Sequence, residues 1–329
     1  MLTTISKSNT TCLIGKMNCC KEKPVIILES GEKLCKRHFT DYFEGKVLKT
    51  IRQFHLIEKE ENLGIALSGG KDSLTVLHIL SRLSKENPKI KINAIAIDEG
   101  IDGYRDKTLE IAKKYCYENE ISLNIFSYKE EFGATLDGML KILNVRPCTI
   151  CGILRRYLLN KKSKELKLTK LATGHNLDDE CQSILMNQFK NNIEASARLG
   201  PKVGIGNDNI IVNNNMFVQR IKPLYLCTEK EVTTYAFLNG LLDDFAECPN
   251  AVLSYRAQVR DMLNEIEHKF PGTKYSIANS FLQTLPMLKE KFKHDTIKVC
   301  AKCSEPSSNE VCNACIYLEK LTVFPPTQP

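Results

Sequence analysis

The chain has 329 residues, of which 43% are hydrophobic and 26% are charged, the composition of an ordinary globular protein with one or two domains. No apolar run is as long as a transmembrane helix, and the first residues lack the apolar segment of a signal peptide, so we expect a cytoplasmic protein without a membrane span. The formal net charge of +7 suits a polyanionic partner, but so modest an excess does not identify one.

Apolar spacing and turn residues predict the elements in chain order. A helix is expected over 46–61, where apolar residues recur at helical spacing. Strands are then expected at 63–67, 90–97, 122–128 and 170–173, alternating with helices at 72–84, 105–118, from 151 onward and at 178–189. A Gly- and Asn-rich loop or hairpin at 201–217 precedes helices at 228–239, 252–268 and 276–292. The alternation predicts an α/β fold, a doubly wound parallel sheet with helices on both faces.

Polar clusters follow three of the predicted strands, at residues 68–73, 98–100 and 174–179. In a parallel sheet of this kind, ligands bind at the carboxyl ends of the strands. The three clusters are therefore expected to meet at one edge of the sheet and to form a ligand site there.

The first cluster, Ser68-Gly69-Gly70-Lys71-Asp72-Ser73, predicts a phosphate-binding loop. Glycines let the backbone approach phosphate oxygens, and the N–H groups at a helix start attract anions. Lys71 adds a positive charge. Asp72 follows the lysine, so the segment is not the common loop that ends in Lys-Ser or Lys-Thr. The alternative is a Gly-rich turn without a ligand.

The same segment resembles the pyrophosphatase loop of the N-type ATP pyrophosphatase superfamily, whose PP-loop domain has a Rossmann-like, doubly wound fold. In that superfamily the loop holds the pyrophosphate of ATP while a substrate oxygen attacks the α-phosphate and becomes adenylated. Lys71 would stabilise the charge that develops in this step. The resemblance implies these ATP-binding residues: Ala66, Ser68, Gly69, Gly70, Lys71, Asp72, Ser73, Asp98 and Gly174.

The segment Gly174–Asp179 resembles the second active-site loop of the same superfamily. By this resemblance Asp179, or less favourably Asp178, orients Mg²⁺ or acts as a base. The alternative is a helix N-cap, for which Asn176 or Asp178 is well suited. Both interpretations can hold together.

The 14 cysteines are expected to bind metals or to carry out chemistry, because structural disulfides are rare in a reducing cytosol. Cys148 and Cys151 form a CxxC pair that enters a helix, which suits a redox pair, half a zinc site or half a cluster site. Cys248 is followed by proline, a feature of some iron–sulfur ligand runs. Three thiolates on a four-iron cube leave one iron open to an external sulfide. The alternative is a redox-active CxxC that carries a persulfide.

The C-terminal cysteines have the spacing CxxC-x8-CxxC, a strong four-thiolate zinc signature. Its members are Cys300, Cys303, Cys312 and Cys315. Fortuitous spacing is the alternative. Three other cysteines are expected to be buried small hydrophobes: Cys116, Cys181 and Cys227.

An N-terminal zinc site is less regular. Cys35 and His38 supply a Cys-x-x-His half, but Cys19 and Cys20 are adjacent rather than separated by two residues. One of that pair is therefore an uncertain ligand, and Cys12 could replace it.

Together these motifs resemble the TtcA/TtuA/NcsA family of tRNA 2-thiolation enzymes over nearly the whole chain, most closely the NcsA/TtuA branch with two zinc modules. The resemblance implies a [4Fe-4S] cluster on Cys148, Cys151 and Cys248, together with ATP, Mg²⁺ and two Zn²⁺ sites. It also implies an N-terminal zinc module at 1–45, a PP-loop catalytic domain with a helical tRNA-binding part at 46–295, and a C-terminal zinc module with a tail at 296–329.

The implied enzyme is an ATP-dependent tRNA sulfurtransferase that adenylates O2 of a uridine, inserts sulfur, and forms AMP and pyrophosphate. The segment CGILRRYLLN resembles the wobble-type branch and favours uridine 34 over uridine 54 of the T-loop. Thiolation of cytidine 32 is disfavoured, because that branch lacks the zinc modules. The implied partners are tRNA, a sulfur donor (sulfide or a ubiquitin-like thiocarboxylate protein) and a second copy of the chain.

Basic residues after the CxxC pair are candidates for tRNA phosphate contacts, first Arg155 and Arg156 and then Lys161, Lys162 and Lys164. A second lysine cluster lies at 289–293, and a solvated helix face is the alternative for both. Two other functions remain open: an adenylating amidotransferase or ligase, for which no glutaminase domain is evident, and a zinc-ribbon RNA-binding scaffold with a vestigial ATP site. The intact Lys71 and Asp72 argue against the scaffold.

Overall fold

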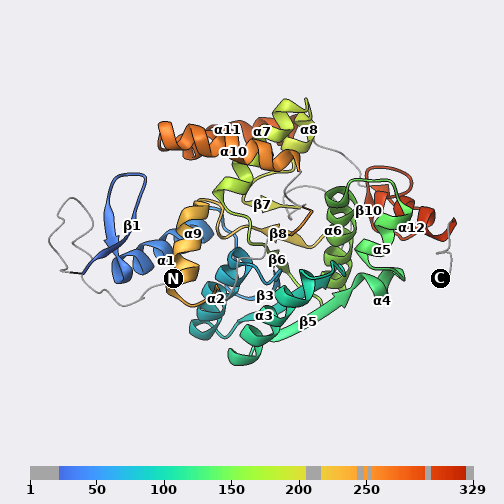
Figure 1. Ribbon diagram of the computed structural model, residues 1–329, viewed down its shortest axis with the longest axis horizontal. Helices are drawn as coiled ribbons and strands as arrows, with labels where there is room; N and C mark the ends of the chain where they lie inside the picture. Colours follow the sequence, from blue (N-terminus) through green and yellow to red (C-terminus); the bar gives the residue numbers. More distant parts are fainter. Residues whose placement is uncertain (1–21, 205–215, 243–247, 251–253, 293–297, 324–329) are drawn as a thin grey trace.

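The computed structural model describes residues 22–204, 216–242, 248–250, 254–292 and 298–323 (Figure 1). A six-stranded sheet lies at its centre, and the N-terminal hairpin and the C-terminal cysteine module lie at opposite ends of the long axis (Figure 1). None of the helices in these ranges is both long enough and apolar enough to cross a membrane.

The central sheet has the strand order β5-β4-β3-β6-β8-β7, and every neighbouring pair is parallel except β7 with β8. Its strands are β3 (Glu61–Ala66), β4 (Ile90–Asp98), β5 (Ser122–Ser127), β6 (Lys170–Ala172), β7 (Lys202–Val203) and β8 (Gln219–Ile221). The predicted doubly wound parallel sheet is confirmed. The chain proceeds outward from β3 to β5 and then returns to the other side of β3, so the strand order reverses between β3 and β6. In folds of this type, ligands bind at that reversal.

Helices cover both faces of the sheet, because successive strand residues point to opposite sides. In β4, Ala94 belongs to one apolar core and Ile95 to the other. The first core is formed with α1 (Lys36–Gln53), α2 (Lys71–Glu86), α3 (Arg105–Glu118) and α9 (Glu229–Leu238). The second is formed with α4 (Tyr128–Phe132), α5 (Leu136–Ile142), α6 (Pro147–Glu165) and α12 (Asn313–Val323).

A separate helical group lies beyond the β7 side of the sheet (Figure 1). It consists of α7 (Leu177–Phe189), α8 (Ile193–Ser196), α10 (Tyr255–Lys269) and α11 (Thr273–Lys291). Buried Leu177 and Cys181 of α7 pack there with Val259 and Leu263 of α10. This packing fixes the axis of α7, whose first residues belong to the predicted second loop.

Several element boundaries differ from the sequence prediction. The helix expected over 46–61 is α1, which begins ten residues earlier and follows a hairpin of β1 (Pro24–Ile27) and β2 (Lys33–Cys35). Phe39 and Phe43 are fully buried in the sheet's core. Their i, i+4 spacing continues into Val47, so one amphipathic helix runs across the expected domain boundary at residue 45. The short elements α4, α5, α8 and β8 were not predicted, because each is too short to show a period.

Candidate active site

The loop between β3 and α2 is closed by its own hydroxyl groups. Ser73 Oγ accepts from the Ser68 backbone N–H at 3.1 Å and donates to the Gly70 carbonyl at 2.9 Å, and the Gly70 N–H donates to Ser68 Oγ at 3.3 Å. Gly69 has φ +84°, and a Cβ there would lie 2.0 Å from the Thr108 carbonyl oxygen. Only glycine fits this position, so the loop has the preformed, backbone-lined shape that phosphate binding requires.

Lys71, the first residue of α2, lies between two carboxylates. Its Nζ is 3.0 Å from Asp72 Oδ2 and 3.1 Å from Glu229 Oε1, and only 15% of its side chain is exposed. Burial opposes the charge, but Asp72 and Glu229 outweigh burial, and the pKa of Lys71 is raised above its ordinary value. A permanent positive charge is thus held at the loop.

The second predicted loop packs directly on the first. A Cβ on Gly174 would lie 2.8 Å from the Ser73 backbone nitrogen, so glycine permits the close approach. Asn176 Nδ2 donates to Asp72 Oδ1 at 3.0 Å, while Asn176 Oδ1 accepts from the Asp179 N–H at 3.1 Å. Asn176 is the N-cap of α7 and forms a capping box with Asp179, so the N-cap interpretation is confirmed for Asn176.

Two carboxylates, Asp72 and Asp179, converge where these loops meet. The pKa of Asp179 is raised to about 6, first by burial and next by the negative charge of Asp72. Arg256 Nη1 is 3.8 Å from Asp179 Oδ1 and opposes this shift. Paired carboxylate oxygens that repel each other are the donor set that Mg²⁺ prefers in proteins.

Asp178 differs from Asp179, because the protein already occupies both of its oxygens. Oδ1 accepts from Lys274 Nζ and Oδ2 accepts from the Glu229 N–H at 2.8 Å, and the Asp178 side chain is buried. Asp178 thus joins α7, α9 and α11, and each of its oxygens already accepts a hydrogen bond from the protein.

The three central cysteines converge although 97 residues separate Cys151 from Cys248. Cys148 Sγ donates to the Asn250 carbonyl at 3.4 Å, which brings it beside the Cys-Pro segment. Burial and the proximity of Cys148 raise the pKa of Cys248. Cys248 also packs against the apolar core that contains Cys151. The fold therefore brings together the trio that the sequence singled out.

The trio is wider than a site for one ion. In the described ranges, the one set of three or more such ligand atoms mutually within 4.8 Å is the C-terminal set, so at least one pair of the central sulfurs is further apart. Tetrahedral zinc places its thiolates about 3.8 Å apart, given Zn–S bonds of about 2.3 Å. In a four-iron cube each thiolate binds a different iron and the spacing is wider. The donor set suits a cluster better than a single zinc.

Arg155 lies one helical turn after Cys151, and its side chain points to that residue. Arg155 Nη2 donates to Cys151 Sγ at 2.9 Å, and Arg155 Nε is 3.2 Å from Glu99 Oε1. Glu99 follows Asp98, whose Oδ1 accepts from the Gly100 N–H at 2.9 Å and closes the turn after β4. Asp98 thus lies at the carboxyl edge of the sheet, as predicted.

Several cations lie around His175, and three of them pair with carboxylates: Lys222 with Glu180, Arg256 with Asp179 and Arg155 with Glu99. His175 Nδ1 is 2.9 Å from Thr173 Oγ1, and the pKa of His175 is lowered by partial desolvation, although the residue is exposed. Four cations lower it further: Lys222, Arg256, Arg220 and Arg155. Positive charges from α6, β8 and α10 therefore gather beside the second loop.

A groove of about 1570 Å³ runs between β8, the end of α11 and the C-terminal module. Arg156 and Arg220 lie at one part of its wall, and the charge of Arg156 adds to burial in lowering the pKa of Arg220. Lys202 and Lys289 form a second pair, in which burial and Lys202 lower the pKa of Lys289. Over the described ranges these four cations form no ion pair with a carboxylate, whereas lining residue Glu305 is neutralised by Lys164. The lining also holds Glu58, Glu60, Glu61, Glu194 and Glu290, so the unpaired positive charge is confined to these two cation pairs and does not extend over the whole groove.

The other basic residues after the CxxC pair are used inside the fold. Lys161 and Lys162 both contact Glu131, at 3.5 and 2.6 Å, and Lys164 pairs with Glu305. The tRNA contacts expected at these three lysines are therefore not supported by their geometry, whereas Arg156 faces the groove.

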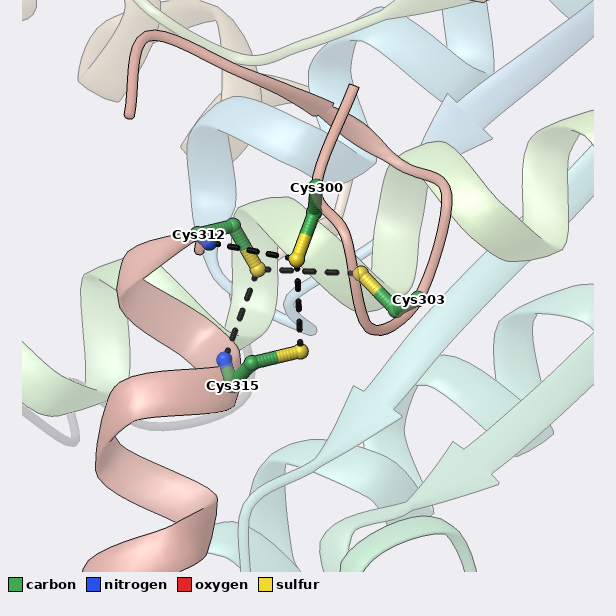
Figure 2. Close-up of side chains that lie close together, drawn as sticks. All are labelled: Cys300, Cys303, Cys312 and Cys315. Atoms are coloured by element: carbon green, nitrogen blue, oxygen red, sulfur yellow. Dashed lines mark hydrogen bonds between the residues drawn. The ribbon is translucent and has the colours of Figure 1, made fainter. Parts of the chain in front are cut away.

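The C-terminal cysteines form a closed set (Figure 2). Cys300 Sγ is 3.8 Å from Cys315 Sγ, and Cys303 Sγ is 3.7 Å from Cys312 Sγ. The backbone N–H groups of Lys302 and Cys312 donate to Cys300 Sγ. Cys300 and Cys303 follow β9 (Lys298–Val299), a strand that is hydrogen-bonded to β10 (Pro306–Ser307). Cys312 and Cys315 lie at the start of α12. These separations match the sulfur spacing of tetrahedral zinc.

The N-terminal metal residues are only partly described. Cys35 immediately precedes α1, and its Sγ is 3.4 Å from Nδ1 of His38 in the first turn. Cys12, Cys19 and Cys20 lie outside the described residues. The three cysteines expected to be buried are buried: Cys116, Cys181 and Cys227.

Comparison with known proteins identifies the family of this chain. The family model of the PP-loop domain ATP_bind_3 matches residues 40–265. The chain is 36% identical to the tRNA-5-methyluridine(54) 2-sulfurtransferase of Pyrococcus horikoshii, over 91% of this chain and 92% of that one. It is 33% identical to the tRNA 2-thiolation protein NcsA of Haloferax volcanii, over 89% and 94%. The chain belongs to the TtcA/TtuA/NcsA family of tRNA 2-thiolation enzymes.

A solved structure of the same family has a similar fold. It is described as the U34-tRNA thiolase NcsA of Methanococcus maripaludis with its [4Fe-4S] cluster. Its TM-score with this chain is 0.78 at 33% identity, over 94% of this chain and 97% of that one. Two residues of the present site, Glu229 and Arg256, were not found by sequence reasoning. No local motif contains either one, and only the packing of α9 and α10 brings them to the loops.

Proposed function

We propose that this chain is an ATP-dependent tRNA sulfurtransferase that converts wobble uridine 34 to 2-thiouridine and forms AMP and pyrophosphate. One observation carries the proposal: a phosphate loop, a carboxylate pair and a cysteine trio meet at the carboxyl edge of one sheet. Arg155 contacts Cys151, and its partner Glu99 begins the loop after β4, beside the nucleotide loop. A site that activates an oxygen and then delivers sulfur needs both sets of groups together.

The nucleotide half has an assignment for each group. The Ser68–Ser73 backbone and Lys71 hold the phosphates, and Asp98 and Gly174 border the nucleoside. Asp179, with Asp72, supplies oxygen ligands for Mg²⁺. Asp178 takes no part in this chemistry, because Lys274 and the Glu229 N–H occupy its oxygens.

The sulfur half consists of Cys148, Cys151 and Cys248. When a [4Fe-4S] cluster is bound to them, one iron lacks a protein ligand and is open to an external sulfur atom. The width of the trio and the buried position of Cys151 support this group over a single zinc. Sulfide or a thiocarboxylate protein would supply the sulfur, and the C-terminal set and the N-terminal Cys35/His38 half would each hold Zn²⁺.

The RNA half is the basic groove. Mutually repelling cations without acidic partners are stabilised by a polyanion, and phosphate contacts supply most of the affinity for RNA. Arg156 lies on α6, the helix that carries the CxxC pair, so a phosphodiester backbone bound beside it would present a nearby base to the cysteines. Thiolation requires such an unpaired base, and both loop positions, 34 and 54, offer one.

Nucleoside mass spectrometry of tRNA tests the function and the position. Deletion of the gene should remove 2-thiouridine at position 34, and the wild-type chain should restore it, whereas Cys248→Ala should not. Cys116→Ala is the matched control, since this buried thiol lies outside the site. Loss of 2-thiouridine at position 54 instead would show that uridine 54, and not uridine 34, is the modified base. Unchanged thiouridine at both positions would reject the function.

A further inference from the structure

Glu99 is a buried carboxylate placed between two arginines. It lies at the end of β4 with 6% of its side chain exposed, and Arg105 is similarly buried. Glu99 Oε2 is 2.9 Å from Arg105 Nε, and Glu99 Oε1 is 3.2 Å from Arg155 Nε. Each oxygen therefore serves a different guanidinium. Because buried charges depend strongly on their partners, removing this carboxylate affects both arginines together.

The two arginines end on the two halves of the site. Arg105 Nη1 donates to the Ser68 carbonyl at 2.6 Å, under the nucleotide loop. Arg155 Nη2 donates to Cys151 Sγ at 2.9 Å, at the cysteine trio. An unbroken series of contacts thus runs from Ser68 through Arg105, Glu99 and Arg155 to Cys151.

At the nucleotide end, the contact between Arg105 and the Ser68 carbonyl orients a hydrogen-bond donor for phosphate, the Gly69 N–H. The peptide between Ser68 and Gly69 is planar and trans, so its C=O and N–H point in opposite directions. With the carbonyl held by Arg105, the Gly69 N–H faces the opposite side, toward the phosphates of a bound nucleotide. Arg105 Nη1 also donates to Thr108 Oγ1 at 3.1 Å, and the Thr108 carbonyl packs on Gly69.

At the sulfur end, the contact changes the electronic character of a thiolate. A charge-assisted N–H···S bond withdraws electron density from the sulfur, and bonds of this kind tune metal–thiolate sites. Such a bond acts only if the guanidinium keeps its orientation. Glu99 fixes that orientation, since Arg155 is otherwise half-exposed.

We propose that Glu99 is a positioning residue that couples nucleotide binding at Ser68–Gly69 to the chemical state of Cys151. A phosphate that accepts from the Gly69 N–H polarises the Ser68–Gly69 peptide and strengthens the contact of its carbonyl with Arg105, and the shared carboxylate connects Arg105 to Arg155. The inference rests on the proposed function only in taking Cys151 as a cysteine of the sulfur half. Coupling of this kind is reciprocal, so the state of Cys151 also alters nucleotide affinity.

The test compares Glu99→Gln with the wild type in metal-free protein. Cys151 is alkylated with iodoacetamide with and without α,β-methylene-ATP, and each cysteine is followed by peptide mass spectrometry. We expect the nucleotide to change the Cys151 rate about fivefold or more in the wild type, and not in Glu99→Gln. Cys116, which is also buried but lies outside the site, serves as an internal reference in every sample, because a change at both cysteines would report opening of the fold.

Two further variants separate positioning from folding. Glu61→Gln makes the same change in an equally buried carboxylate at the opposite end of β3, paired with Lys170 at 2.6 Å, and should keep the full response. Arg155→Lys keeps the charge but loses the forked contact, and should lose the response while remaining folded. A Glu99→Gln protein that retains the full response would overturn the proposal, as would Glu61→Gln losing it equally.

A second readout uses the cluster-loaded protein. The nucleotide should shift the midpoint potential of the cluster in the wild type, and this shift should be absent in Glu99→Gln. If no cluster can be loaded, the cluster assignment fails, but the alkylation response still decides the role of Glu99. The two failures are therefore distinguishable.

Discussion

The C-terminal four cysteines and the central cysteine trio differ in how closely the sulfur atoms approach one another and in how many hydrogen bonds the protein gives them. The C-terminal four lie within 4.8 Å of one another, with two sulfur pairs at 3.7 and 3.8 Å, and receive backbone N–H bonds, so the site is complete in its own residues. The central trio is wider, includes an exposed thiol at Cys148, and adjoins the crowded arginines Arg155 and Arg156.

The difference indicates two different uses of the same side chain. Closed, saturated metal sites stabilise folds, whereas sites that carry out chemistry keep open positions and unbalanced charges. Changes in the first site should cost stability, and changes in the second should cost activity. The predictions below test whether stability and activity depend on different sites in this way.

The largest effect is expected for Cys312→Ser. Loss of one ligand should remove one zinc per chain and lower the free energy of unfolding of the C-terminal module by about 5 kcal/mol or more. Zinc content by mass spectrometry and urea unfolding would measure it. Cys148→Ser is the matched comparison and should change stability by about 0.5 kcal/mol at most, since this thiol is exposed. Full zinc retention in Cys312→Ser would show that the closed set is not a zinc site.

Lys71→Ala should reduce kcat about 100- to 1000-fold, as expected when a preorganised positive charge is removed from a transition state. Its partners Asp72 and Glu229 are partly exposed, so the fold should be preserved. AMP release during thiolation would be measured. Lys89→Ala, an exposed lysine paired with Glu60, is the control. Comparable activity in both variants would remove Lys71 from the reaction.

Asp179 should make activity depend on pH. Its pKa of about 6 in the folded chain is above the ordinary aspartate value, so ionisation destabilises the native state and this cost appears as the pH rises through 6. Activity should rise over the same range, because Mg²⁺ binds the carboxylate. Asp179→Asn should be inactive yet more stable than the wild type at neutral pH without Mg²⁺, by less than about 1 kcal/mol given the 34% exposure.

The comparison for Asp179 is made by thermal unfolding across pH. The stability gain of Asp179→Asn should vanish in acid, where both side chains are neutral. A gain that persists unchanged at low pH would assign the effect to packing rather than to charge.

The smallest effect is expected in the groove. Lys289→Ala should weaken tRNA binding modestly and reduce the slope of log K against log salt concentration by about 1, the value for one phosphate contact. Lys162→Ala should leave the slope unchanged, because Glu131 already occupies that lysine. Equal slopes in both variants would place the RNA outside the groove.

Much of the fold followed from local pattern. The helix at Arg105–Glu118 was predicted to the residue, because its apolar period and flanking turns are strong. The sheet followed from strand and helix alternation, and the loops from their position after strands. Helix α1 was misplaced, because Cys35 and His38 suggested a metal module where Phe39 and Phe43 continue a core helix.

The site was predictable where it is contiguous and not elsewhere. Ser68–Ser73 and Gly174–Asp179 each contain their own signal, and the cysteine spacing contains another. Glu99, Glu229 and Arg256 act through partners far away in the sequence, and a single charged residue after a strand or in a helix has no pattern of its own. The basic run at 161–164 misled for the same reason, since its acidic partners come from elsewhere.

If Cys35 and His38 hold the proposed metal at the root of α1, its binding would be tied to the cooperativity of the whole domain. These residues begin the same helix that buries Phe39, Phe43 and Val47 against the sheet. Ligation there fixes the first turn and thereby the register of the apolar face. A chelator that removed this metal would fray the helix from its amino end into the core, so metal release and domain melting should merge into one transition.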